Sequence, residues 1–468
     1  MNDLRISASE FHTLAARITR LAADYLTALE ELPAFPAVSG ADTLQAFRAP
    51  LPAQGMGPAA LDALCDVLEF SRPPSPRFFG YVHGSGEPVA ALGDLLASVL
   101  NQNVTAWRSA PAAVTLERQL IDALAAALGC LGHRGSFCGG GSMANLMGLA
   151  MAREAHLPAK ASGARPGIVY ASSEVHMSIP KAVALLGLGR ENLRLIPADE
   201  CFRMSLGPLR EAIVADRAAG RRPLAVVATS GTVNTGSIDP LAEIATLCRE
   251  YGLWMHVDGA YGALAALAVP EKFVGLNAAD SLSLDPHKWL YQPLDCGVLL
   301  FKDADAARAA FSDSGDYVRP LAADPIEGYA FFEESLELSR RFRALKLWLS
   351  LRYHGVDAFR SAIGADLRHA QLLARQISQS ARLELSAPVA LSAVCFRYRL
   401  EDSAQGDRLN AAILKRVIER GRVYLSNATL GGRFALRACF VNHRTTEADV
   451  AQIVPEVLAA ADEVLDSR

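Results

Sequence analysis

Ser281-Leu-Ser-Leu-Asp-Pro-His287-Lys288-Trp289 decides the fold of this chain, together with the earlier stretch Leu253-Trp-Met-His-Val-Asp258-Gly-Ala260-Tyr261. Each stretch has the pattern of a short apolar strand that ends in polar residues. In an open α/β sheet, the ligand crevice lies at the carboxyl ends of the strands. We therefore expect Asp258, His287 and Lys288 to lie at the edge of one binding site.

The residue types at these two strand ends indicate a particular chemistry. A lysine can form a Schiff base with an aldehyde, and a buried aspartate can hold a proton on a pyridine nitrogen. Lys288 and Asp258 are therefore the pair that a pyridoxal phosphate (PLP) enzyme needs, although a lysine considered alone is usually a solvated surface residue. The stretches HVDGAYG and DPHKW also resemble those of the PLP-dependent group II decarboxylases, which include aromatic amino acid, glutamate and cysteine sulfinate decarboxylases.

The composition argues against several other classes of protein. The chain has 468 residues, of which 51% are hydrophobic, and a formal net charge of −4. This balance argues against a nucleic-acid-binding protein and against a basic protein of membrane surfaces. Its eight cysteines include no CxxC pair and are typical of a reducing compartment. Charges recur near the N-terminus, so we expect no signal peptide and a soluble, cytoplasmic protein.

Strands and helices alternate regularly along the middle of the chain. Apolar strands are predicted at residues 167–172, 193–196, 224–229 and 298–301, and two more lead to Asp258 and Lys288. This alternation predicts an α/β fold with a mostly parallel sheet sandwiched by helices. The resemblance implies the PLP-dependent transferase-like fold, fold type I.

We predict three parts in the chain: an N-terminal helical arm and linker at 1–74, a large PLP-binding α/β domain at 75–356, and a small C-terminal α+β domain at 357–468. Residues 33–58 have the composition of a linker, and residues 303–338 that of an irregular segment. In the C-terminal part, helices are predicted at 357–380, 407–420 and 447–466, with strands near 383–387, 392–400, 422–426 and 434–441.

Residues 1–32 are predicted to form an amphipathic helix. Ser7 and Glu10 make a capping box at its start. Such a helix docks either on its own subunit or on a second one. The resemblance implies the second arrangement, a homodimer with active sites at the subunit interface. The apolar stripe of the helix consists of Phe11, Leu14, Ile18, Leu21 and Tyr25.

A glycine-rich turn precedes a predicted helix, in the stretch Phe137-Cys138-Gly139-Gly140-Gly141-Ser142-Met143-Ala-Asn145. Glycines let backbone amides approach an anion closely, and a helix N-terminus adds a partial positive charge. A tight turn is the usual role of such a cluster, but here it predicts a phosphate cradle. The stretch resembles the family's TSGGSEAN, with Cys138 and Gly139 replacing Thr and Ser, so one hydroxyl partner of the phosphate is expected to be missing. The predicted cofactor-binding residues of this turn are Gly140, Gly141, Ser142 and Met143.

Four further positions are expected to contact the cofactor because they match the family. His176 lies in the pattern SxxxHxSxxKA, whose histidine stacks on the cofactor ring in the family. Thr232 precedes Val233, which stands where the family has a threonine near the cofactor. Ala260 and His287 adjoin the two strand ends. The resemblance implies catalytic roles for Lys288, Asp258 and His176, and no metal site is predicted.

The substrate pocket is expected to include four residues, because the corresponding segments line it in the family: Tyr81, His83, Asn103 and Arg437. Without the resemblance, the first three are ordinary loop and core positions. Arg437 interrupts an apolar strand and needs a partner, which is either an internal carboxylate or the carboxylate of the substrate. Asn103 and Arg437 favour an acidic substrate, whereas Tyr81 favours an aromatic one.

Residues 314–335 are expected to form a mobile loop that closes over the partner subunit's site, since SRRFRALKLW follows them as in the family. The family loop carries a tyrosine that protonates the substrate carbon, and we assign this role to Tyr329. Counting back from Arg340 without gaps reaches Phe331 instead, and aldehyde synthases carry phenylalanine there. With Tyr329 in this role, the resemblance implies decarboxylation of an L-amino acid to its amine and CO₂. Oxygen-dependent aldehyde formation, transamination and PLP binding without catalysis are the alternatives.

Overall fold

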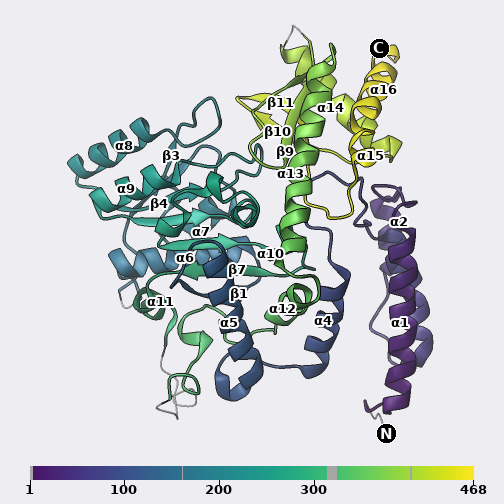
Figure 1. Cartoon of the computed structure of the whole chain (residues 1–468), viewed down its shortest axis with the longest axis horizontal. Coiled ribbons are helices and arrows are strands. Elements are labelled where there is room, and N and C mark those ends of the chain that lie inside the picture. Colours follow the sequence, from purple (N-terminus) through teal and green to yellow (C-terminus); the bar gives the residue numbers. More distant parts are fainter. Residues whose placement is uncertain (1–3, 161, 314–323, 401–402, 468) are drawn as a thin grey trace.

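A seven-stranded sheet lies at the centre of the computed structural model, which describes residues 4–160, 162–313, 324–400 and 403–467 (Figure 1). The strand order is β1-β7-β6-β5-β4-β2-β3, and the strands from β6 to β3 are parallel to one another. Strand β7 is antiparallel to both β6 and β1. The predicted mostly parallel sheet is therefore confirmed. The strands are β1 (Arg134–Cys138), β2 (Ile168–Ser172), β3 (Leu193–Ile196), β4 (Pro223–Thr229), β5 (Trp254–Asp258), β6 (Ser281–Leu284) and β7 (Gly297–Phe301).

Helices cover both faces of this sheet, because successive residues of a strand point to opposite faces. On β4, Ala225 and Val227 belong to the apolar cluster that includes α6, α7 and α11. Val226 and Ala228 belong to the cluster that includes α5, α8 and α9. These helices are α5 (Pro111–Ala127), α6 (Gly141–His156), α7 (Ser178–Leu185), α8 (Leu206–Ala218), α9 (Leu241–Tyr251) and α11 (Ala304–Phe311).

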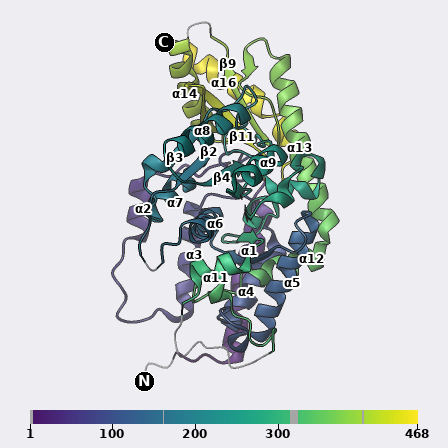
Figure 2. The same cartoon turned by 90° about the vertical axis from the view of Figure 1, so that its left-hand side faces the viewer.

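A second sheet of four antiparallel strands follows in the order β10-β11-β9-β8. Helices α13, α14 and α16 pack on it around a separate apolar cluster. In the side view of Figure 2, this part forms the end of the molecule that carries the C-terminus. The division at residue 357 stays a prediction. The elements are α13 (Val356–Gln379), β8 (Leu383–Leu385), β9 (Ala393–Tyr398), α14 (Ser403–Arg420), β10 (Ser426–Leu430), β11 (Arg433–Cys439), α15 (Glu447–Val450) and α16 (Ile453–Asp466).

The strand predicted near 422–426 was placed too early, because β10 begins at Ser426. Gly431 and Gly432 have φ angles of +55° and +77°, and they separate the paired residues Leu430 and Arg433. Positive φ at both positions is the requirement of a two-residue hairpin turn of type I′. The glycine pair therefore fixes the end of β10.

Two other segments contain more helix than predicted. Asp303 caps α11 by accepting hydrogen bonds from the amides of Asp305 and Ala306, so residues 303–338 are not wholly irregular. Ser39 and Asp42 form a capping box at the start of α2, within the predicted linker 33–58. Local capping explains both helices. The N-terminal helical segments after α1 are α2 (Gly40–Phe47), η1 (Gly57–Ala63) and α3 (Leu64–Phe70).

The predicted N-terminal helix is α1 (Ala8–Ala28), which begins where Ser7 accepts a hydrogen bond from the amide of Glu10. All residues of α1 are described, and none of them is buried. Figure 1 shows α1 along the outer edge of the molecule. Apolar side chains of α1 therefore remain open to solvent in the single chain.

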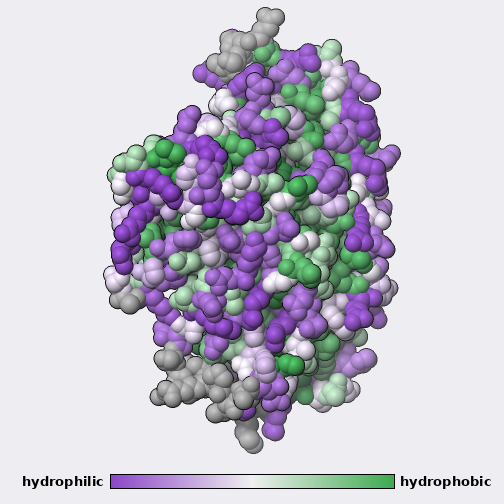
Figure 3. All heavy atoms as spheres, turned by 60° about the vertical axis from the view of Figure 1, so that its left-hand side comes forward, coloured by the Kyte–Doolittle hydropathy of each residue, from purple (hydrophilic) through white to green (hydrophobic). Residues whose placement is uncertain are grey.

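Helix α4 (Pro88–Leu100) packs against α12 (Ala344–His354) beside the large sheet. Within the described ranges, no helix combines the length and the apolar character needed to cross a bilayer. All eight cysteines are free. On the face seen in Figure 3, hydrophilic and hydrophobic residues are interspersed.

Candidate active site

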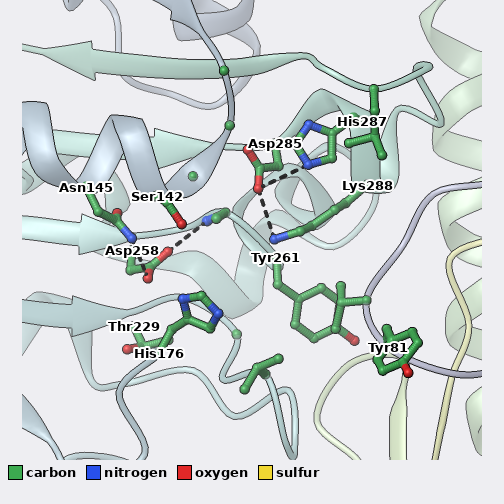
Figure 4. A pocket seen from close by; sticks show the side chains of 18 of the residues that line it. Tyr81, Ser142, Asn145, His176, Thr229, Asp258, Tyr261, Asp285, His287 and Lys288 are labelled. Carbon is green, nitrogen blue, oxygen red and sulfur yellow. Dashed lines mark hydrogen bonds and ion pairs between the residues drawn. The ribbon is translucent and has the colours of Figure 1, made fainter. Parts of the chain in front are cut away.

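The carboxyl ends of β4, β5 and β6 meet at a cavity of about 400 Å³ (Figure 4). Thr229 and Asp258 end two of these strands, and Lys288 lies on the short helix α10 (Pro286–Trp289) that follows the third. The fold thus brings together the two strand ends that the sequence singled out. Ten predicted site residues line the cavity: Tyr81, Gly140, Gly141, Ser142, His176, Asp258, Ala260, His287, Lys288 and Arg437.

Five predicted site residues lie outside the lining that the described chain gives this cavity. Met143 packs against the apolar cluster beside α6. The hydroxyl of Thr232 lies 2.8 Å from that of Thr235, within its own turn. The five residues are Met143, Thr232, His83, Asn103 and Tyr329.

The segment that carries His83 crosses directly over the lysine segment. A Cβ atom on Gly84 would lie 2.2 Å from the carbonyl oxygen of His287 and 2.7 Å from that of Lys288. Only glycine fits such an approach. Burial and the nearby Arg72 lower the pKa of His83 to about 4, so its ring is neutral at pH 7. The segment of His83 and Gly84 therefore packs closely against the lysine segment, although His83 does not line the cavity.

Asp258 is buried, and three donors hold its carboxylate in place. Asn145 Nδ2 lies 2.9 Å from Oδ2, whereas the amide of Ala260 and the hydroxyl of Ser283 each lie 3.2 Å from Oδ1. Figure 4 shows Asn145 and Asp258 side by side at the cavity wall. Asn145 lines the cavity, and no role was predicted for it because its partners lie far along the chain, on β5 and α7.

The glycine turn and the N-terminus of α6 form one wall of the cavity. Gly140 has a φ of +118°, a conformation that favours glycine. A Cβ on Gly141 would lie 2.6 Å from the Cβ of Ala260 and 3.0 Å from Asp285 Oδ2. The backbone amides at the start of this sixteen-residue helix are therefore open to an anion at close range.

Asp285 lies between the glycine turn and the lysine. Its Oδ2 is 2.9 Å from Lys288 Nζ and 3.4 Å from His287 Nε2 (Figure 4). A carboxylate beside a phosphate cradle opposes an anion, but the adjacent Lys288 balances its charge. Asp285 stands within the DPHKW motif, yet no role was predicted for it. Its place between the cradle and the lysine depends on the turn into α10.

The residues present fit PLP. Two buried oxygens of residues that line the cavity have no hydrogen-bond partner among the described residues: Thr229 Oγ1 and Asp285 Oδ1. Buried polar atoms are rarely left unsatisfied in a folded protein, so a polar group is expected there. A glycine cradle for phosphate, an amine for an aldehyde and a carboxylate for a ring nitrogen surround the same space.

Arg437 reaches the cavity from β11. Its Nε donates a 3.1 Å hydrogen bond to Ser426 Oγ, and its guanidinium also donates to the carbonyl oxygen of Val233. It is 5% exposed and forms no ion pair with any described residue. The internal ion pair that the sequence left open is therefore absent from the described chain, and the positive charge remains for a ligand.

Tyr329 and Phe331 lie on a packed segment away from this cavity. The ring of Tyr329 lies beneath the guanidinium of Arg118, and its hydroxyl donates a 3.1 Å hydrogen bond to Glu334. Burial, together with Glu334, raises the pKa of Tyr329. Phe331 is fully buried beneath Arg340. Of the predicted loop 314–335, residues 314–323 lie outside the described residues, and residues 329–331 are held in place by these contacts.

A lysine on α10, an aspartate at the end of β5 and a glycine turn before α6, arranged on a mostly parallel sheet, define a PLP enzyme of fold type I. Residues 68–399 match the family model of the pyridoxal-dependent decarboxylase conserved domain, and the chain belongs to this family. It is therefore a PLP-dependent carboxy-lyase that acts on an amino acid.

Three known proteins place the chain within this family. It is 34% identical to an aromatic-L-amino-acid decarboxylase of Bacillus atrophaeus, over 99% of this chain and 98% of the relative. It is 31% identical to a phenylacetaldehyde synthase of Petunia hybrida, over 92% and 90%. The crystal structure of Oryza sativa TDC with PLP and tryptamine superposes with a TM-score of 0.92 at 28% identity, over 99% of this chain and 100% of that one. The predicted fold and cofactor are confirmed.

Proposed function

We propose that this chain converts an aromatic L-amino acid to the corresponding amine and CO₂. The charge of the cavity is the observation that carries the substrate class. Among the described lining residues, Lys288 and Arg437 are the cations, since burial lowers the pKa of both His176 and His287. Lys288 is needed for the cofactor, so Arg437 is the cation of the described lining that remains for a substrate carboxylate. An acidic amino acid has two carboxylates, and its second one finds no cation in this lining.

The rest of the cavity lining supports an aromatic side chain. Tyr81, Val82, Tyr261 and Leu294 offer aromatic and apolar surface around the same space. Asn103, which favoured an acidic substrate in the sequence, instead accepts a 2.9 Å hydrogen bond from the backbone of Arg340. The name of the bacterial relative and the tryptamine bound in the rice structure point to the same aromatic class.

In this proposal, Lys288 Nζ is the attachment point for the aldehyde of PLP, and the amides of the glycine turn bind its phosphate. Asp258 holds the proton on the ring nitrogen, and His176 covers one face of the ring and excludes water from it. PLP supplies, when bound, the electron sink that lets the bond to the carboxylate break. Arg437 binds and orients the substrate carboxylate.

We also propose a homodimer whose subunits complete each other's sites. Exposed apolar side chains on α1, including Phe11 and Ile18, need cover that the single chain does not supply. Helix α4 exposes Leu92, Leu96 and Val99 in the same way. The segments that carry Asn103 and Tyr329 meet where Ala106 pairs with Ala330, and both residues lie outside the cavity of their own chain. In the proposed dimer, these two residues reach the cavity of the second subunit.

The free cysteines support a reducing, cytoplasmic location.

The oxidative alternative depends on which residue reaches the substrate from the loop. Phe331, which an ungapped count selects, is fully buried, and Arg340 lies 4.2 Å above the centre of its ring. Moving it into a cavity would unpack this core position. Tyr329 is also held by contacts, but it is only half-buried and its release costs less than that of Phe331, which supports Tyr329 as the loop acid and decarboxylation in preference to aldehyde formation.

A substrate panel tests the proposal. Purified, PLP-loaded protein is given aromatic and acidic amino acids under air and under nitrogen, while CO₂, amine, peroxide and oxygen uptake are recorded. Equal CO₂ and amine from an aromatic substrate, regardless of oxygen, is the expected result. Turnover confined to glutamate or cysteine sulfinate would overturn the substrate class. Peroxide and aldehyde that disappear under nitrogen would establish the aldehyde synthase instead.

The assignment of Lys288 has its own test. Borohydride reduction of the loaded protein, followed by peptide mass spectrometry, is expected to place the cofactor on Lys288. The Lys288→Ala variant is expected to give no adduct and no CO₂. Attachment at another lysine would refute the assignment, whatever substrate the enzyme uses.

A further inference from the structure

A line of buried side chains connects Asp258 to the interior of the sheet. Trp254 Nε1 donates to Ser281 Oγ at 2.8 Å, and Ser281 Oγ lies 2.8 Å from His256 Nδ1. His256 Nε2 lies 2.9 Å from Asn145 Oδ1, and Asn145 Nδ2 lies 2.9 Å from Asp258 Oδ2. His256 and Ser281 are fully buried, and Asn145 is 1% exposed. This row of five residues is called the Asp258 relay below.

The chemistry of the donors fixes the direction of the hydrogen bonds from Trp254 and to Asn145 Oδ1, and a neutral His256 then fixes that of Ser281. An amide oxygen only accepts, so His256 Nε2 must carry a proton toward Asn145. An indole nitrogen only donates, so the single hydroxyl proton of Ser281 is free to point to His256 Nδ1. One arrangement of protons therefore satisfies all five members, and in it His256 is neutral.

One further observation supports a neutral His256, and a second explains how its ring is accommodated. Burial lowers its pKa to about 4, so the ring is uncharged at pH 7. Gly148, one turn beyond Asn145 on α6, leaves room for the ring, since a Cβ there would lie 2.6 Å from His256 Nδ1. The helix thus supplies both the amide that binds the histidine and the space that receives it.

A branch of the relay reaches His176. The second proton of Asn145 Nδ2 points to Ser178 Oγ at 2.9 Å, which leaves the Ser178 hydroxyl proton for His176 Nδ1, also at 2.9 Å. The backbone amide of Ser178 points to the same nitrogen at 3.2 Å. Because Nδ1 accepts from both groups, the proton of neutral His176 lies on Nε2. Asn145 is therefore shared by two proposed cofactor contacts.

We propose that His256 and Asn145 are positioning residues that keep Asp258 ionised, so that the proton it shares with the PLP ring nitrogen stays on the ring. This inference rests on the proposed function of Asp258. A donor on Oδ2 makes a carboxylate less basic. Without the N–H of His256, the Asn145 amide is free to turn and place its oxygen against Asp258, which favours a protonated acid.

The test uses holoenzyme loaded with PLP labelled with ¹⁵N in the ring, since the ¹⁵N signal reports protonation of that nitrogen directly. His256→Gln keeps an N–H near the position of Nε2, whereas His256→Leu removes it. His133→Leu is the matched control, because His133 is also buried and hydrogen-bonded, to Ala279, outside the cavity. Asn145→Ala removes the donor itself and carries the test if His256→Leu does not fold.

We expect the wild type, His256→Gln and His133→Leu to keep the ring nitrogen protonated over the same pH range. In His256→Leu or Asn145→Ala, the proton is expected to leave at least about one pH unit lower, and the Kd for PLP to rise about tenfold. An unchanged titration in both of these variants would overturn the inference. If the ring nitrogen is unprotonated in the wild type, or if its titration is unchanged in Asp258→Asn, the proposed role of Asp258 is overturned instead.

Discussion

The hydroxyl of Tyr291 donates a 2.8 Å hydrogen bond to Asp366, which joins the segment after Lys288 to helix α13. Both residues are buried, and Tyr291 has a φ of +53°, which is uncommon for a residue with a side chain. The hydrogen bond to Asp366 therefore holds the turn at Tyr291, three residues after Lys288. It also links the lysine segment to the C-terminal part of the molecule.

The pH dependence of unfolding is expected to report Asp366. Burial raises its pKa to about 7, against about 4 in an unfolded chain. Between these values the folded state binds one proton more, so this contribution to stability is complete below about pH 4 and is lost as the pH rises through 7. The loss amounts to at most about 1.4 kcal/mol per pH unit. Asp366→Asn is expected to flatten urea-midpoint curves between pH 5 and 8. A slope identical to that of the wild type would contradict this, and the exposed Asp122→Asn serves as the control.

The ion pair between Glu117 and Arg340 is expected to be costly to break on one side. Both side chains are fully buried, and Arg340 also donates to the carbonyl oxygens of Val104 and Phe137. Arg340→Met leaves a carboxylate in the core and is expected to lose about 3–5 kcal/mol of unfolding free energy. Adding Glu117→Gln is expected to recover part of this loss. Calorimetry of the four proteins measures the coupling, and simple additivity would contradict it.

A serine at position 139 is expected to strengthen PLP binding. The family has a hydroxyl there, and a Cβ on Gly139 meets only Asp295 Oδ2, at 3.4 Å. Gly139→Ser therefore fits and adds a partner for the phosphate, which lowers the Kd by about threefold to tenfold. Gly141→Ser is the matched control, since its Cβ would clash with Ala260 at 2.6 Å and binding is expected to fall. Fluorescence titration of the cofactor-free protein measures both, and a weaker Gly139→Ser would refute the role assigned to the turn.

Hybrid dimers are expected to show whether the loop acts on the partner subunit's site. One subunit carries Lys288→Ala, the other carries Tyr329→Phe, and two affinity tags isolate the mixed species. If Tyr329 serves the other subunit, one of the two sites is intact and the dimer forms amine at about half the wild-type rate. If Tyr329 serves its own site, both sites are defective. Each homodimeric variant is the control, and amine formation near zero in the hybrid would overturn the proposed exchange.

The sequence predicted the residues at the strand ends of the site, but not all of the residues that surround them. Asp258 and Lys288 were predicted because each lies at the end of its own apolar strand, a pattern that is complete within a few residues. Asp285 and Asn145 were not, although both stand inside the quoted motifs. The partners of Asn145 lie on β5 and α7, and only the fold brings them within hydrogen-bond distance. Asp285 is placed beside the glycine turn by the turn into α10.

The loop and the hairpin were misjudged for similar reasons. Polar composition suggested a poorly packed segment up to residue 335, but Arg118 and Arg340 hold Tyr329 and Phe331 in place. The apolar run before Ser426 suggested a strand, whereas the φ angles of the two following glycines decide where β10 ends. Contacts between distant residues decided the first case, and turn geometry the second.

The cavity is lined by residues as far apart in the chain as Tyr81 and Arg437. A chain still being synthesised has no complete site until its last strands have left the ribosome. The residues proposed to hold PLP lie between Gly140 and Lys288, whereas Arg437, proposed for the substrate carboxylate, belongs to the second sheet. Capture of the cofactor is therefore expected to report that the large sheet has formed, and binding of the substrate that both sheets have formed.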